Sequence, residues 1–196
     1  VEGIEILANE VYDKAATDLT DILTKIKGTP GVQAVVNWSI VPAQSIVAKN
    51  MRQLGMTVPL FQSHGFGNLK YVEQAGVAAE GILFPLGHLM VCEQLPDTHP
   101  QKKVLTAYRQ AYESRYQEDV SAFGGYAHDA LMIVLEGLRR AGEPDRSKVR
   151  EAIEHLSNYA GVTGVFNFSP TDHTGLTLDA FLMLVVKDGK FTIYQP

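Results

Sequence analysis

The sequence predicts an α/β protein in which a parallel sheet is followed by a run of helices and then by antiparallel strands. Three observations lead to this fold class. Short apolar runs alternate with amphipathic stretches over residues 1–86, apolar side chains recur at helical spacing over residues 101–156, and strand-like patterns return over residues 161–194. A chain of 196 residues, 45% of them hydrophobic, is long enough for one domain, or two small ones, with a buried core.

The first part of the chain repeats a strand–helix unit. Residues 17–27 place four apolar side chains on one helical face, and the Gly28-Thr29-Pro30-Gly31 stretch ends that helix. The next helix begins near Pro42, which a first helical turn tolerates, and ends near Gly55. Strands are expected at residues 3–8, 32–38, 58–62 and 81–85, and a short helix near residues 69–75. Strands and helices that alternate in this way form right-handed crossovers, so we expect a parallel sheet covered on both faces.

After Leu86 the pattern becomes helical. Helices are expected at residues 101–116, 126–141 and 147–156. Arg139, Arg140 and Gly142 are typical of the end of the second helix, and Ser147 is expected to cap the start of the third. Strands return at residues 161–168 and 178–186, and a turn at residues 187–190 leads into a last strand at residues 191–194.

Composition and charge exclude several classes of function. A formal net charge of −5 argues against a nucleic-acid-binding surface, which needs clustered positive charge. The single cysteine, Cys92, excludes an internal disulfide framework and a cysteine-based metal cluster. No apolar run approaches the length of a membrane span. The chain begins at Val1 without a leader-like segment, so we expect a mature product or a part of something longer.

The sequence carries no recognisable catalytic set. It has no Gly-x-Ser-x-Gly motif, and no two histidines have the spacing of a metal-binding helix. The Gly65-Phe66-Gly67-Asn68 stretch follows a strand, but Lys70 stands where the dinucleotide-binding fingerprint requires a third glycine. We therefore expect no enzyme activity, no bound cofactor and no metal site.

The ends of the predicted parallel strands supply the candidate binding residues. Ligands of open parallel sheets bind beyond the carboxyl ends of the strands. Those ends carry aromatic, aliphatic, hydroxyl and histidine side chains: Trp38, Ser39, Ile40, Ser63, His64, Phe66 and Phe84. Such a set suits a small molecule with an apolar body and one polar or charged end. Trp38 is equally compatible with a place in the core.

Seven short stretches of the sequence carry a family pattern. Three lie in the first part of the chain, at residues 32–38 with the Pro42 helix, 56–68 and 79–82. Four lie in the second part, at residues 126–130, 140–142, 161–166 and 186–191. Taken together and in this order, they resemble the type I periplasmic binding proteins of the branched-chain amino acid class, the solute receptors of ABC importers.

The resemblance implies a receptor whose two α/β lobes close on a solute in the cleft between them and present it to a membrane permease. Residues 1–86 would form the second-lobe core, residues 87–160 the helical part of the first lobe, and residues 161–196 strands that return to the second lobe. The N-terminal part of such a receptor would lie outside this sequence. The implied location is periplasmic, or extracellular and associated with a bacterial membrane.

One departure from the family pattern concerns the solute. Relatives that hold an amino acid place an acidic residue against its ammonium group where this sequence has His64. A histidine suits an anion or a hydroxyl better, so we expect either an amino acid or a hydrophobic or aromatic carboxylate. Two alternatives stay open: a ligand-sensing domain of a signalling or regulatory protein, and an α/β enzyme on the same fold. An incomplete receptor would expose sheet edges and apolar helix faces, which favours a homodimer.

Overall fold

The computed structural model describes residues 3–195, and the chain divides into two compact units. Unit 1 comprises Val1–Pro85 and Met183–Pro196, and unit 2 comprises Leu86–Leu182. The first boundary lies one residue before the predicted one. The second differs, because residues 161–182 belong with the helices of unit 2 and the chain returns to unit 1 only at Met183.

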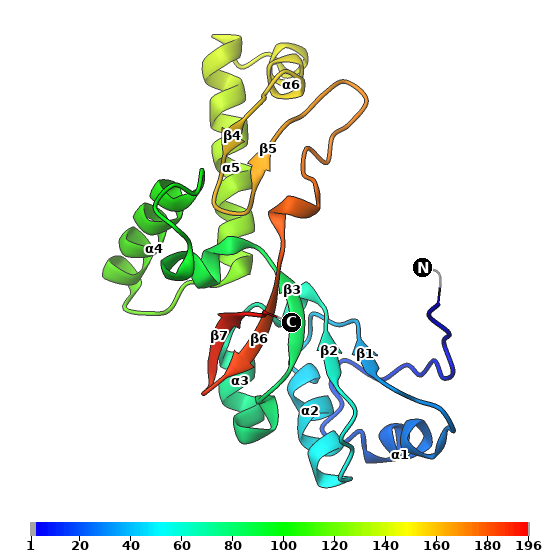
Figure 1. The fold of residues 1–196 in the computed structure, drawn as a ribbon. Helices are drawn as coiled ribbons and strands as arrows, with labels where there is room; N and C mark the ends of the chain where they lie inside the picture. Colours follow the sequence, from blue (N-terminus) through cyan, green and yellow to red (C-terminus); the bar gives the residue numbers. More distant parts are fainter. Residues whose placement is uncertain (1–2, 196) are drawn as a thin grey trace. The chain divides into compact units, whose positions relative to one another are not determined.

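The sheet of unit 1 is built from strands that are far apart in sequence. Its order is β1-β2-β3-β6-β7, and Figure 1 shows the strands side by side in this order. The parallel strands are β1 (Val35–Asn37), β2 (Leu60–Gln62) and β3 (Leu83–Leu86), with Val36 opposite Phe61 and Phe61 opposite Leu83. The strands β6 (Leu182–Lys187) and β7 (Lys190–Ile193) form the predicted antiparallel hairpin.

Three α-helices of unit 1 form where the sequence predicts them, one before the first strand and two between strands. They are α1 (Thr20–Gly28), α2 (Gln44–Gln53) and α3 (Leu69–Ala75), followed by the short 3₁₀ helix η2 (Gly76–Ala79). The side chain of Asn68 accepts a hydrogen bond from the backbone N–H of Lys70 and caps the start of α3. Apolar residues of α1 and α2, such as Leu23 and Val47, are buried, as their helical spacing predicts.

Two expectations for unit 1 are wrong. Residues 3–8 form no strand, and Ile4 and Ile6 are 72% and 80% exposed. A strand needs a hydrogen-bonded neighbour, and among the described residues the sheet ends at β1 without pairing to this segment. The sheet is also not covered on both faces near this edge, because α1 packs against α2 and α2 against α3, while Val36 is 70% exposed.

Unit 2 is mainly helical. Its helices are the 3₁₀ helix η3 (His88–Gln94), α4 (Lys102–Tyr116), α5 (Ala122–Ala141) and α6 (Arg146–Glu154). The predicted end of α5 is confirmed, since Gly142 adopts a left-handed φ of 75° and donates to Leu138 O. The start of α6 is corrected: Asp145, and not Ser147, is the N-cap, and it accepts a hydrogen bond from Lys148 N–H.

The expected strands at residues 161–168 and 178–186 are shorter than predicted. Only β5 (Val165–Phe166) forms in the first stretch, where it pairs antiparallel with β4 (Tyr159–Ala160). Residues Leu178–Ala180 form a 3₁₀ turn, η4, before β6 begins. A small core of Ile133, Leu156 and Phe166 holds this hairpin against α5, which explains why residues 161–182 stay within unit 2.

A buried carboxylate joins α5 to the loop between β4 and β5. Asp129 is 2% exposed and accepts hydrogen bonds from Val162 N–H at 2.9 Å, Thr163 N–H at 2.7 Å and the Thr163 hydroxyl at 2.6 Å. A Cβ atom at Gly161 would lie 2.6 Å from the Asp129 carboxylate, so this position needs glycine. Two of the stretches that carry the family pattern, residues 126–130 and 161–166, are thus joined by one side chain.

Within residues 3–195, no helix is both long enough and apolar enough to span a membrane.

Candidate functional site

The candidate site lies in unit 1, at the edge where β1 and β2 end. Asn37 and Gln62 are the last residues of these two parallel strands and lie opposite each other. The backbone N–H of Ser63 donates to Asn37 O at 3.0 Å, so the loops that follow the two strands leave the sheet together. The carboxyl edge of the sheet therefore brings residues 38–43 and 63–68 side by side, as the parallel arrangement predicts.

The hydroxyl of Ser63 ties these two loops to each other. It donates to Ser39 O at 2.7 Å and accepts from Ser39 N–H at 3.3 Å and Gly65 N–H at 3.2 Å. Ser63 is 2% exposed, so its polar capacity is used inside the protein. This predicted site residue is therefore buried and holds the two loops together.

Gly65 allows the two loops to approach at backbone distance. A Cβ atom there would overlap the carbonyl oxygen of Ser39 and would lie 2.8 Å from Ile40 Cγ2. The glycine is therefore required by loop packing. No phosphate-binding role is needed to explain this glycine-rich stretch.

Two rings from the two loops meet at the surface. Trp38 and His64 lie with their ring centroids 5.9 Å apart in an edge-to-face arrangement with an interplanar angle of 72°. Trp38 is 78% exposed, so it is not a core aromatic, and Ile40 beside it is 63% exposed. Ser39 and His64 are half-buried. These four side chains form the part of the candidate site that solvent reaches.

Two predicted site residues lie beneath this edge and do not reach the surface. Phe66 and Phe84 are both 0% exposed. Their rings pack edge-to-face with centroids 5.4 Å apart, and Phe84 packs against Phe191 at 4.9 Å. Phe66 ends the short 3₁₀ helix η1 (His64–Phe66), whose tight turn directs it inward while His64 stays at the rim. Both phenylalanines support the site from the core.

Under the two loops lies a chain of buried polar side chains that the sequence pattern does not predict. The Tyr12 hydroxyl donates to Asn37 Oδ1 at 2.9 Å, and Asn37 Nδ2 donates to Gln62 Oε1 at 2.7 Å. Gln62 Nε2 donates to Gln44 O at 3.0 Å, and Gln44 Nε2 donates to Gly65 O at 3.1 Å. The available signal was that the apolar strands β1 and β2 each end in an amide residue.

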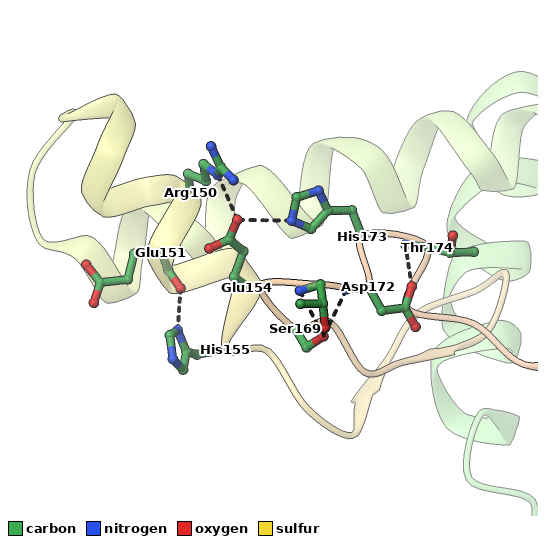
Figure 2. Close-up of polar contacts among 9 residues, drawn as sticks. Arg150, Glu151, Glu154, His155, Ser169, Asp172, His173 and Thr174 are labelled. Carbon is green, nitrogen blue, oxygen red and sulfur yellow. Dashed lines mark hydrogen bonds and ion pairs between the residues drawn. The ribbon is translucent and has the colours of Figure 1, made fainter.

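A second polar cluster lies in unit 2, between α6 and the loop after β5. Figure 2 shows Arg150 and His173 reaching the same carboxylate: Arg150 Nε lies 2.7 Å and His173 Nε2 3.0 Å from Glu154 Oε1. The hydrogen bond from Arg150 is the main cause that lowers the pKa of Glu154. A shallow pocket of about 430 Å³ lies beside them, with Ile153 and Phe168 in its wall.

This cluster does not form a nucleophile relay. The Ser169 hydroxyl accepts from Asp172 N–H at 3.0 Å, and Asp172 Oδ1 accepts from Thr174 N–H at 2.9 Å, which are the bonds of a tight turn. The His173 ring contacts Glu154 and not Ser169. Nor do residues 3–195 contain a group of three or more His, Cys, Asp or Glu side chains arranged to hold a metal ion.

Comparison with known proteins adds sequence evidence to this geometry. A family model described as periplasmic binding protein matches residues 1–190. The chain is also 26% identical over 193 residues to the leucine-, isoleucine-, valine-, threonine- and alanine-binding protein of Pseudomonas aeruginosa. That match covers 98% of this chain and 46% of the other protein.

Solved structures agree with the fold. An extracellular ligand-binding receptor from Rhodopseudomonas palustris superimposes with a TM-score of 0.87 at 27% identity, covering 98% of this chain and 56% of that one. A branched-chain amino acid transporter substrate binding protein from Streptococcus pneumoniae, in complex with isoleucine, gives a TM-score of 0.71 at 22% identity, covering 93% of this chain and 50% of that one. The likeness to the second shows the fold alone. The chain spans about half the length of these relatives.

Proposed function

Because this chain belongs to the periplasmic binding protein family, we propose that it supplies one part of the solute site of an extracytoplasmic receptor for an ABC importer. The observation that carries the proposal is the pair of rings at the carboxyl edge of parallel strands, the exposed Trp38 and the half-buried His64. An exposed tryptophan beside a histidine offers an apolar surface and one polar group to a small solute. No covalent step is assigned, and the relatives are named as binding proteins and receptors.

The solute that best fits these loops is a small carboxylate with a hydrophobic or aromatic body. Residues 38–42 and 63–68 contain no Asp, Glu, Lys or Arg, so His64 is the only ionisable side chain in these two stretches. An ammonium group would find no carboxylate in these loops, whereas a carboxylate can accept a hydrogen bond from the imidazole. Trp38 and Ile40 would contact the apolar body. An amino acid is the second candidate.

A solute titration tests this proposal. Phenylacetate and leucine are added separately to the longest natural chain that contains these residues, while Trp38 fluorescence and the melting temperature Tm are followed. A solute that binds only the folded protein adds about 2.7 kcal/mol at a free concentration of 100 times Kd, so Tm should rise. If neither these two solutes nor a wider panel of small amino acids and carboxylates changes either signal, the receptor proposal is wrong.

Matched variants of His64 test the choice of solute. His64→Glu should weaken carboxylate binding and favour an amino acid, because a carboxylate repels an anion and pairs with an ammonium group. His64→Gln keeps a hydrogen-bond donor without charge and is the control. If the unmutated protein and the His64→Glu variant rank the solutes in the same order of affinity, His64 does not contact the solute.

We further propose that this bacterial receptor is periplasmic, or extracellular and associated with the membrane, with the importer's permease as its partner. Support comes from the relatives' names, which describe a periplasmic family and extracellular receptors.

The chain alone should also form homodimers, since Ile4, Ile6 and Val11 of unit 1 are 72–86% exposed. Sedimentation velocity of the isolated chain should show a dimer, and a single monomeric species would contradict this.

A further inference from the structure

The amide of Gln44 occupies an unusual position below the candidate site. Gln44 is the first residue of α2 and is 0% exposed. Its Nε2 donates to Gly65 O at 3.1 Å, in the middle of η1, and its backbone carbonyl accepts from Gln62 Nε2 at 3.0 Å. One residue therefore contacts both the end of β2 and the loop that follows it.

The other atom of this amide is a cost to stability. Gln44 Oε1 is buried and has no hydrogen-bond partner within the described part of the chain. A buried acceptor without a partner destabilises a fold. An apolar side chain of similar length, such as methionine, would fill the volume without that cost. Stability alone therefore does not explain a glutamine at this buried position. What glutamine provides and an apolar residue cannot is the hydrogen bond to Gly65 O.

That contact fixes how the two loops meet. Gly65 touches the backbone of Ser39 and Ile40 closely enough to exclude a Cβ atom. Any displacement of Gly65 therefore moves η1 relative to the loop after β1. The rings of Trp38 and His64 belong to these two segments, so the distance between the rings depends on the position of Gly65.

We propose that Gln44 is a positioning residue of the solute site, which sets the Trp38–His64 arrangement through Gly65. This inference depends on the proposed function in one respect, because it treats this pair of rings as part of a solute site. Gln62 assists, because its amide links Gln44 to Asn37 and so to the end of β1.

The test compares two substitutions in the same helix by NMR without any solute. In the unmutated chain, the indole of Trp38 and the imidazole of His64 should give nuclear Overhauser cross-peaks. Gln44→Met removes the donor to Gly65 O and should abolish these cross-peaks. Val47→Ala, which shortens a buried core side chain of α2 that is 4% exposed, should lower Tm by roughly 5–10 °C yet keep the cross-peaks.

Two results would overturn the proposal: unchanged cross-peaks in Gln44→Met, or equal loss of them in Val47→Ala. Should Gln44→Met fail to fold, Gln62→Met removes the neighbouring link and should weaken the same cross-peaks, and their persistence there would count against the proposal. Because the measurement contains no solute, it is independent of the titration above. A negative titration with a positive NMR result would reject the receptor function while keeping Gln44 as the residue that positions the two rings.

Discussion

Replacing Asp129 by alanine removes the acceptor that holds the loop at residues 161–163 against α5. The carboxylate is buried and accepts three hydrogen bonds, two from the backbone N–H groups of Val162 and Thr163 and one from the Thr163 hydroxyl. In the variant these donors stay in a protein interior without a partner. Each buried donor left unsatisfied costs about 1–3 kcal/mol. Because the loop can relax once the carboxylate is gone, and because neighbouring contributions are not strictly additive, we expect a total in the lower part of that sum, about 3–5 kcal/mol.

A loss of this size is a large share of the stability of a small domain, which is about 5–15 kcal/mol. The assay is urea unfolding followed by far-UV circular dichroism. Asp119→Ala is the matched control, because Asp119 is exposed and its loss should change the unfolding free energy by less than about 0.5 kcal/mol. Thr163→Val removes only the hydroxyl bond and should cost about 1 kcal/mol. A cost below about 1 kcal/mol for Asp129→Ala would refute the reasoning, since the loop would then be held by other contacts.

Two further predictions concern stability in each unit. Burial, and then the neighbouring His99, lowers the pKa of His88 below 6.5. The His88 imidazole therefore binds a proton more tightly in the unfolded chain than in the folded one, so unit 2 should lose stability as the pH falls below about 6.5. In urea unfolding at pH 7.5 and 5.5, His88→Leu should reduce that loss. In unit 1, Phe84→Ala should cost about 3–5 kcal/mol, whereas Trp38→Ala should cost less than about 0.5 kcal/mol; the reverse order would contradict their assignment to core and surface.

The sequence predicts the loops of the candidate site well because a simple rule governs them. The carboxyl ends of neighbouring parallel strands lie at the same edge of a sheet. The residues at the ends of the predicted strands 32–38 and 58–62 are therefore expected to lie close together. Trp38 and His64 do meet, although they are 26 positions apart along the chain (64 − 38). The same rule does not say which side chains of a loop point outward. Phe66 follows His64 by two residues in a 3₁₀ turn and is turned into the core.

Other features depend on partners that periodicity does not reveal. The apolar alternation of residues 3–8 predicts a strand, but a strand is stable only beside another one, and none of the described residues supplies it. Gln44 reads in the sequence as an ordinary polar residue of a first helical turn. Its burial and its bond to Gly65 follow from how α2 packs on the sheet, which no local pattern encodes.

In both units a glycine and a buried polar side chain together fix a loop. In unit 2, Gly161 lies against the Asp129 carboxylate, which accepts a hydrogen bond from Thr163 N–H. In unit 1, Gly65 lies against the backbone of Ser39, whose carbonyl oxygen accepts a hydrogen bond from the Ser63 hydroxyl. In each case a missing Cβ permits the approach and a buried polar side chain holds it. Stretches of the family pattern fall on these loops because the geometry demands those residues. Trp38 is exposed and His64 is half-buried, so we expect substitutions at these two positions to change the binding of the proposed solute without altering the shape of the loops.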